Sequence, residues 1–288
     1  MARYANLVYT NLFLLFKYFR CEIVYSACGE LTYGFALANI LRLGRRHLFN
    51  VQHHAHHLMF TKGYDRIFFI SSVIADHYSG LKNKETLCWG CDEGFAKSSF
   101  DTAWDGTYEY YFASIGKCFR DDDILAQASE SLGARTLVIS DVNSLAKKYR
   151  DVTFVAGVRN GENPVGYREV FKYMQKTKFI VIPIIPQPYG FSLGLSGLTS
   201  FVDAMAAGKP VLVSDNTNMG VDVENLGLGF VYKAGNMNEM KEKMQRMLEM
   251  SDNEYSCMVE RVKSYASKHD YANFCKSLTS SIISRAGK

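Results

Sequence analysis

Short apolar runs alternate with helix-like segments along most of the chain, and this alternation is the feature that most restricts its fold. Apolar runs occur at 110–115, 136–139, 152–155, 179–184 and 210–213, and a segment with helical spacing lies between each pair. A run as apolar as 179–184 (FIVIPI) fits a strand buried on both faces. Strands that alternate with helices predict parallel sheets covered by helices on both sides, that is, a doubly wound α/β fold.

The pattern occurs twice, on either side of the polar segment 98–107 (SSFDTAWDGT), which shows no periodicity. We therefore predict two domains, residues 1–103 and residues 104–288. In the first, strand-like runs at 22–26, 47–52 and 66–71 accompany a helical segment at 31–43. In the second, the chain is expected to be helical from residue 236 to the end.

Charge and cysteine content limit the partners, the cellular compartment and the metal sites that fit this chain. The chain has 33 Lys and Arg against 29 Asp and Glu, a net charge of +4 that is too small and dispersed to indicate a nucleic-acid partner. Its 7 cysteines are an odd number at irregular spacing without a secretory leader, which is typical of reduced thiols in a cytoplasmic protein. Cys88 and Cys91 form a single C-x-x-C pair, which we interpret as structural because a zinc site needs four ligands.

Residues 4–16 carry no charge, include the run 12–16 (LFLLF), and are flanked by Arg3, Lys17 and Arg20. The stretch is too short to span a bilayer, which needs about 20 apolar residues. It fits either a helix packed on the core, which we favour, or a helix that lies in a membrane interface with its cations among the headgroups. Peripheral contact of residues 4–20 with the cytoplasmic membrane face is therefore one hypothesis.

Open parallel sheets bind ligands at the carboxyl ends of their strands, so ligand-binding residues are expected in the loops that follow strands. The first such loop follows the run 110–115 and contains Gly116, Lys117 and Arg120 just before a helix. These residues suit a phosphate, although solvated surface charges are the commoner explanation. The usual nucleotide fingerprints, G-x-G-x-x-G and the P-loop, are both missing from the sequence.

The second loop, residues 188–199 (PYGFSLGLSGLT), is rich in glycine and precedes a helix whose N-terminal amides would face an anion. Helix capping by Ser196 or Thr199 explains their presence equally well. The third loop has histidines at 53, 54, 56 and 57 but no matching Cys or carboxylate cluster nearby. We therefore expect no metal there; a donor or base that lines a cleft is favoured, and ordinary solvated histidines are about as common.

Residues 201–215 (FVDAMAAGKPVLVSD) resemble the E-A-M-A-x-G-x-P-V segment of GT-B glycosyltransferases, especially the retaining glycosyltransferase family 4. The strand at 152–158 (VTFVAGV), the strand at 179–183 and the segment 227–231 (GLGFV), a hairpin in that family, follow in the family's order. The resemblance covers about residues 108–267, and residues 21–92 more loosely. It implies a GT-B fold of two Rossmann-like domains with a shortened N-terminal acceptor domain.

The resemblance also implies residue roles. Asp203 stands where the family's acid holds the ribose hydroxyls of the donor nucleotide. Lys117 and Arg120 match the basic pair that neutralises the donor diphosphate. The remaining matches are Gly116 and the loop residues Ser196, Gly197, Leu198 and Thr199 as donor-binding groups, and His53 or His54 facing the donor sugar as a catalytic group. Negative charge grows on the diphosphate as its bond to the sugar breaks, so fixed cations there would stabilise the transition state without a metal.

The implied activity is transfer of a hexose from a nucleotide-diphosphate sugar, used as substrate rather than cofactor, to a glycan or lipid-linked acceptor in cell-surface polysaccharide biosynthesis. Leu195 replaces a family Glu that contacts the donor hexose, and the first domain lacks a strand and Gly-rich loop expected before residue 21. Two alternatives therefore stay open. One is a non-catalytic GT-B protein that binds a nucleotide or a partner enzyme; the other is a GT-B nucleotide-sugar 2-epimerase.

Overall fold

The computed structural model describes residues 2–27, 29–53, 58–116, 119–140, 149–156, 165–186, 196–217 and 219–287. Its contacts divide the chain into two compact units. Unit 1 contains Met1–Trp89 and the C-terminal Ala272–Lys288, and unit 2 contains Gly90–Tyr189 and Ser196–Tyr271. The polar segment 98–107 therefore lies inside unit 2. The domain limits 1–103 and 104–288 stay a prediction.

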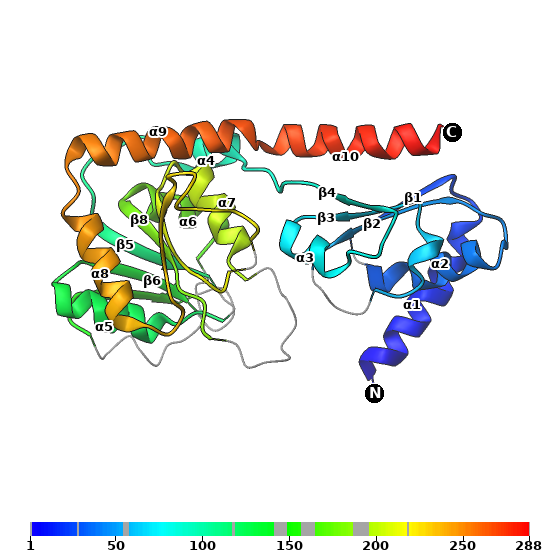
Figure 1. Cartoon of the computed structure of the whole chain (residues 1–288), viewed down its shortest axis with the longest axis horizontal. Helices are drawn as coiled ribbons and strands as arrows, with labels where there is room; N and C mark the ends of the chain where they lie inside the picture. The colour runs from blue at the N-terminus through cyan, green and yellow to red at the C-terminus, as the bar shows by residue number, and fades with distance from the viewer. Residues whose placement is uncertain are drawn as a thin grey trace. The chain divides into compact units, whose positions relative to one another are not determined.

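Unit 1 is built on a four-stranded parallel sheet in the order β1-β2-β3-β4 (Figure 1). Its strands are β1 (Ile23–Ser26), β2 (His47–Gln52), β3 (Arg66–Phe69) and β4 (Lys84–Thr86). Its helices are α1 (Ala2–Tyr18), α2 (Tyr33–Ile40), α3 (Ser72–His77) and the short 3-10 helices η1 (Gly29–Thr32) and η2 (Thr61–Gly63). Phe35 of α2 and Ile74 of α3 are buried in one cluster with Leu48, Ile67 and Phe69 of the sheet.

The C-terminal helix α10 (Tyr271–Ala286) belongs largely to unit 1, although it comes last in the chain. Ser281 on α10 donates from Oγ to Glu85 Oε2 on β4 at 2.8 Å. Phe274 stacks on Trp89, with ring centroids 6.4 Å apart. These contacts are side-chain pairs on the surface of the unit, and no described residue of α10 is fully buried.

Unit 2 contains a six-stranded sheet in the order β10-β9-β8-β5-β6-β7, and every neighbouring pair is parallel. The strands are β5 (Tyr110–Ile115), β6 (Thr136–Ser140), β7 (Val152–Ala156), β8 (Thr177–Ile182), β9 (Val211–Ser214) and β10 (Gly229–Tyr232). The helices are α4 (Glu93–Ser99), α5 (Asp122–Leu132), α6 (Tyr167–Gln175), α7 (Leu198–Ala206), α8 (Met237–Leu248) and α9 (Asp252–Lys268). The strand order reverses between β5 and β8, so loops at their carboxyl ends diverge and leave room for a ligand.

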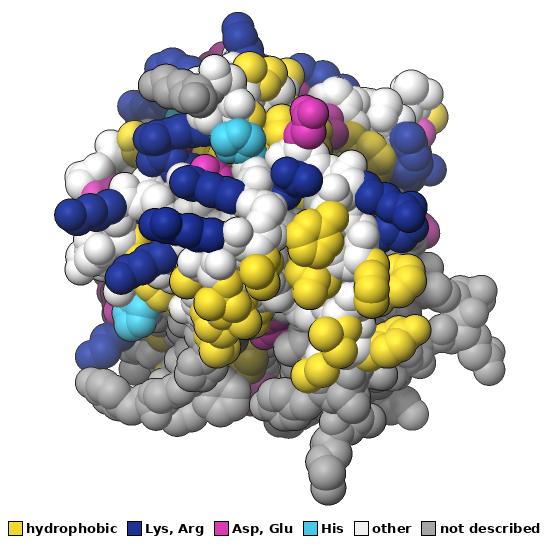
Figure 2. Space-filling view, turned by 90° about the vertical axis from the view of Figure 1, so that its right-hand side faces the viewer, with side chains coloured by type: hydrophobic (Ala, Val, Ile, Leu, Met, Phe, Trp, Pro, Cys, Tyr) yellow, Lys and Arg dark blue, Asp and Glu magenta, His cyan; other side chains and the backbone are white. Residues whose placement is uncertain are grey.

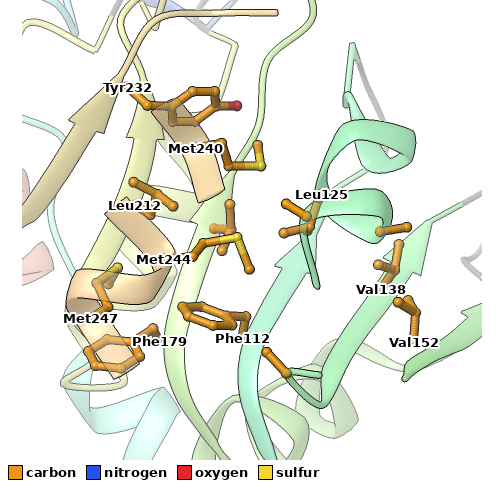
Figure 3. Close-up of a cluster of buried hydrophobic side chains, with 14 of the residues drawn as sticks. Phe112, Leu125, Val138, Val152, Phe179, Leu212, Tyr232, Met240, Met244 and Met247 are labelled. Atoms are coloured by element: carbon orange, nitrogen blue, oxygen red, sulfur yellow. The ribbon is translucent and has the colours of Figure 1, made fainter. Parts of the chain in front are cut away.

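One face of this sheet is sealed by α5 and α8. Figure 3 shows Met240, Met244 and Met247 of α8 directed at the sheet, with Phe112 and Phe179 beneath them. The two phenylalanine rings are stacked, with centroids 5.7 Å apart, and both are fully buried. Unbranched methionine side chains fill the irregular space between helix and sheet, which fixes the strands whose ends form the site.

One local prediction is contradicted by the structure. The segment 227–231 was expected to form a hairpin, and this is wrong: β10 pairs in parallel with β9 instead. Gly229 is required there because a Cβ would lie 1.8 Å from the carbonyl oxygen of Val211. The structural role of the C-x-x-C pair stays an interpretation; both thiols are free, and the amide of Cys91 donates to the carbonyl of His269. Among the described residues, no helix is both long and apolar enough to cross a membrane.

Candidate functional site

The candidate site lies where β5 and β8 end, at the reversal of strand order in unit 2. Arg120 forms its centre, just before α5. The guanidinium Nη2 of Arg120 donates to Ser200 Oγ at 2.8 Å, and Ser200 Oγ in turn donates to the carbonyl of Ile115 at 2.7 Å. Ser200 is buried in the first turn of α7. The end of β5, the loop after it and the start of α7 are thus joined by one hydrogen-bonded chain.

Backbone bonds hold the same loop against the end of β8. The amide of Asp121 donates to the carbonyl of Pro183 at 2.7 Å, and the amide of Ile185 donates to the carbonyl of Phe119 at 2.9 Å. Arg120 and Ile184 form an isolated antiparallel bridge. Phe119 has a φ of +56°, a left-handed conformation that turns the chain so that Arg120 faces the site. Arg120 is therefore fixed by its backbone as well as by Ser200.

Gly116 leaves the space that the Arg120 guanidinium occupies. A Cβ at residue 116 would lie 2.4 Å from Nη2 and 2.5 Å from Nε of Arg120. Real Cβ atoms do not come so close to another heavy atom, so the observed position of Arg120 requires glycine here. The space left by Gly116 is thus filled by the Arg120 side chain, and the role of Gly116 in donor binding stays a prediction.

A buried carboxyl group, not foreseen from the sequence, stands behind Arg120. Asp122 is the first residue of α5 and is 3% exposed, and its Oδ1 accepts a hydrogen bond from Ser114 Oγ at 2.9 Å. Burial raises the pKa of Asp122, and the hydrogen bonds from Ser114 and Ser140 and the positive charge of Arg120 oppose that rise. The only sequence signal was its place in an acidic first turn, which helix capping alone explains.

The start of α7 meets the same edge of the sheet. Gly197 is the N-cap with a φ of +94°, and a Cβ there would lie 2.9 Å from Ile182 Cγ2. Glycine has no side chain, so residue 197 offers no side-chain oxygen to accept hydrogen bonds from the backbone amides in the first turn of α7. Neither Ser196 nor Thr199 is the N-cap, which removes the capping explanation for them. Thr199 is exposed, whereas the side chain of Leu198 is buried, so only the backbone of Leu198 can face a ligand.

Asp203 lies one helical turn beyond Ser200 on α7. Its Oδ1 accepts a hydrogen bond from the phenol of Tyr167, the first residue of α6, at 2.5 Å. Burial raises the pKa of Asp203 to about 6, and the Tyr167 hydrogen bond opposes the rise. The Tyr167 ring stacks on Phe95 of α4 at 5.2 Å. The charge of Arg120 influences the pKa of Asp122 and of Tyr232 but is not among the causes of the shift at Asp203.

The other predicted residues fall elsewhere. His53 follows β2 in unit 1, with its ring edge-on to Trp89 at 5.5 Å. His54 and Lys117 lie outside the described residues. Within the parts of the chain that the structure describes, no three His, Cys, Asp or Glu side chains gather as a metal site would require. Tyr167 and Ser200 are site residues that sequence reasoning missed, because each is recognisable only through its partner.

The sequence matches no protein-family model and no curated protein. Comparison with solved structures gives matches over nearly the whole chain. A glycosyltransferase from Rickettsia africae has a TM-score of 0.73 at 10% identity and covers 97% of this chain and 81% of its own. An α,α-trehalose-phosphate synthase (UDP-forming) from Burkholderia vietnamiensis has a TM-score of 0.71 at 11% identity, with 99% and 80% covered. Alr3699/HepE from Anabaena, in complex with UDP, has a TM-score of 0.69 at 13% identity, with 95% and 82% covered.

At such low identity these matches establish the fold. The chain has the α/β architecture with parallel sheets of GT-B glycosyltransferases, as its sequence predicted. In unit 2, Gly116, Arg120 and Ser200 are brought together at the reversal of strand order, while Asp203 lies one turn further along α7.

Proposed function

We propose that this chain is a glycosyltransferase that uses a nucleotide-diphosphate sugar as donor, with the donor diphosphate bound at Arg120 and the first turn of α7. The observation that carries the proposal is the hydrogen bond from Arg120 to Ser200 across the reversal of strand order in a GT-B fold. A guanidinium and helix amides that converge on one edge are suited to a phosphate group. The Anabaena neighbour is a complex with UDP, and a second of its structures contains UDP and glucose, which makes UDP the first nucleotide to test.

The physical role of Arg120 follows from its rigid attachment. During sugar transfer the bond between the anomeric carbon and the diphosphate breaks, and negative charge accumulates on the leaving oxygen. A cation that is already held by Ser200 and by the backbone needs little reorganisation to meet that charge. Its attraction grows as the charge grows, so it lowers the barrier rather than only tightening substrate binding. Lys117 belongs to the same loop and is proposed as the second cation.

Asp203 is proposed to accept hydrogen bonds from the ribose hydroxyls, and Tyr167 to orient it. Only the ionised carboxylate is an acceptor at both oxygens, and one of these already receives the Tyr167 phenol. Because the pKa of Asp203 is raised to about 6, the ionised fraction increases as the pH rises through that value. Nucleotide affinity should therefore increase between about pH 5 and pH 7.

The finer parts of the proposal rest on the family resemblance. They are a hexose donor, a retaining and metal-independent mechanism of the family 4 type, and His53 or His54 as the group that faces the sugar. Also proposed are Ser196, Gly197, Leu198 and Thr199 as further donor-binding residues. We further propose that the acceptor is a glycan or lipid-linked molecule in cell-surface polysaccharide synthesis. The cysteine pattern supports a cytoplasmic location, and the apolar run within residues 4–20 supports a peripheral membrane contact.

The first experiment is a thermal-shift series with UDP, GDP, ADP, dTDP and CMP, followed by assays of sugar release from the matching nucleotide sugars. A ligand that binds the native state raises the melting temperature by mass action. The proposal predicts a shift with one nucleoside diphosphate that is lost in Arg120→Gln and kept in Arg150→Gln, an exposed arginine of the same unit. Binding without sugar release or transfer would favour the non-catalytic alternative, and a shift that survives in Arg120→Gln would contradict the assigned site.

A further inference from the structure

Helix α1 has one face turned toward unit 1 and another turned away from it. On the inner face, Leu14 and Leu15 pack against the core cluster of the unit. Asn11 on this face accepts a hydrogen bond from the amide of Gly34 at 3.0 Å and donates to the carbonyl of Glu30 at 2.9 Å. The helix is therefore docked through a defined face, and its core-packing role was correctly favoured for that face alone.

Over residues 8–16 the outward face of α1 is apolar. Five of its side chains are large, hydrophobic and exposed: Val8 (59%), Tyr9 (70%), Leu12 (57%), Phe13 (53%) and Phe16 (80%). A surface helix in water normally presents polar residues on this side, and contiguous exposed apolar patches mark sites of protein or membrane contact. The patch continues into Phe19, which is 48% exposed. Its ring lies 3.4 Å from where a Cβ of Gly44 would be, in the turn after α2.

Cations border this apolar face at one end. Arg46 donates from Nη2 to the carbonyl of Phe19 at 3.1 Å, which joins an arginine directly to the end of α1. Arg46 also lines a pocket of about 560 Å³ together with Arg45, His47, Tyr64, Asp65 and Arg285. Figure 2 shows hydrophobic side chains gathered on one face of the molecule, with Lys and Arg side chains grouped above them.

The pocket carries an excess of positive charge. Its lining has three arginines and one carboxylate, Asp65, which lies 3.5 Å from Arg45 Nη2 and 3.6 Å from His47 Nδ1. A second oxygen of Asp65 accepts the amide of Leu48 at 2.8 Å, so this carboxylate is also part of the frame of the pocket. The side chain of Arg45 is 75% exposed. Guanidinium groups bind phosphate oxygens with paired N–H donors, so a pocket lined by three arginines suits a phosphate group.

We propose that unit 1 docks on an anionic phospholipid surface, with the outward face of α1 in the headgroup and acyl boundary and the arginine pocket against lipid phosphates. This deepens the membrane contact of the proposed function and does not depend on sugar transfer. A helix of this kind lies in the interface plane, where exposed aromatic rings enter the lipid and adjacent cations meet anionic headgroups.

Vesicle flotation of the full chain tests the proposal. We expect binding to vesicles of phosphatidylcholine mixed with phosphatidylglycerol, about tenfold weaker binding to phosphatidylcholine alone, and weaker binding at high salt because exposed charges are screened. Phe16→Ser and Arg45→Gln should each reduce binding to the mixed vesicles severalfold. Both side chains are exposed, so the melting temperature should not change. Leu226→Ser and Arg150→Gln, exposed positions of unit 2, are the matched controls.

Three outcomes would overturn the proposal. They are no vesicle binding, equal binding to neutral and anionic vesicles, and a soluble dimer that Phe16→Ser dissociates while vesicles are ignored. Nucleotide binding is measured on the same variants and should be unaffected by either substitution. A chain that binds anionic vesicles but no nucleotide would leave this inference standing and remove the proposed transferase activity, so the two failures are distinguishable.

Discussion

Arg120 and Ser200 are 80 residues apart in the sequence and 2.8 Å apart in space, where Arg120 Nη2 donates to Ser200 Oγ. Ser200 in turn donates to the carbonyl of Ile115, so a single hydroxyl connects α7, the end of β5 and the guanidinium. This connection converts a loop arginine into a fixed cation. It is the geometric basis of our proposal that this edge of the sheet binds the diphosphate of a sugar donor.

Ser200→Ala should weaken nucleotide binding without removing it. The substitution leaves the cation in place but removes its anchor and leaves the carbonyl of Ile115 without this donor. A lost hydrogen bond to a charged group costs about 1.5–3 kcal/mol, which corresponds to a loss of affinity of about ten- to a hundredfold. Calorimetric titration with the nucleotide identified by thermal shift measures it. Ser264→Ala, at an exposed position of α9 in the same unit, is the control for loss of a serine hydroxyl away from the site; an unchanged affinity in Ser200→Ala would contradict the anchoring role.

Gly116→Ala should lower nucleotide affinity while the fold survives. The added Cβ would meet the end of the Arg120 side chain at 2.4 Å, and that flexible end can move away at little cost to the rest of the structure. The guanidinium would then leave Ser200. We expect a melting temperature close to that of the unchanged protein and a loss of binding similar to that of Arg120→Gln. Gly80→Ala, which meets nothing within 4 Å, is the control. Full affinity in Gly116→Ala would show that the observed position of Arg120 is not needed.

Asp203→Asn should stabilise the protein at neutral pH and weaken nucleotide binding. The pKa of Asp203 is raised to about 6 from the ordinary value of 3.8, so between these values the folded state binds more protons than the unfolded state. The burial of this carboxylate therefore does not lower the free energy of unfolding below about pH 4, and it lowers that free energy by its full amount above about pH 6. Asparagine removes a cost of up to about 3 kcal/mol, less to the extent that the group is solvated. Urea unfolding at pH 4 and pH 7 checks this, and an equal gain at both would contradict it.

Lys209→Met should stabilise the protein more at pH 6 than at pH 10. Lys209 is 6% exposed, donates from Nζ to the carbonyl of Gln175 at 2.9 Å, and lies 4.8 Å from the centre of the Tyr108 ring. Burial lowers the pKa of its amine to about 7 from 10.5, so the unfolded state binds the extra proton between those values. Stability therefore rises with pH across this window, and the cost of the buried ammonium is complete below pH 7. Methionine removes that cost and loses one hydrogen bond of about 1 kcal/mol.

Urea unfolding at both pH values measures this difference. Lys178→Met is a comparison variant, because Lys178 also lies over an aromatic ring, that of Tyr255 at 4.7 Å, but its side chain is only partly buried. A stabilisation by Lys209→Met that does not depend on pH would mean that the amine is uncharged in the folded protein throughout the range, or that packing alone accounts for the gain.

The elements that sequence analysis located well are those with local signals. Helix α5 (Asp122–Leu132) lies between the apolar runs 110–115 and 136–139, where a helical segment was expected. Acidic residues mark its first turn, and Gly133, with a φ of +60°, ends it. The strand β4 (Lys84–Thr86) was missed, since it is a short polar strand at the edge of its sheet. Only its pairing with β3 makes it a strand.

The candidate site likewise contains some residues that the sequence indicated and others that it did not. Gly116, Arg120 and Asp203 were singled out from their positions after strands or in a motif. Their partners were not, because Ser200 and Tyr167 are 80 and 36 residues away from the side chains they contact. Asp122 was passed over because a carboxylate in a first helical turn is ordinary until its burial is known.

Taken by itself, the sequence determined the alternating pattern, and through it the parallel sheets and the edge at which we propose that a ligand binds. Periodicity and helix caps depend on neighbours a few residues apart, so they are legible in one chain. Tertiary structure alone decided which groups meet at that edge, and also that the apolar run of α1 packs with one face and exposes the other. The reason is that burial and hydrogen-bond partnership are set by packing between elements distant in sequence, and no local pattern records which of two apolar faces will be covered.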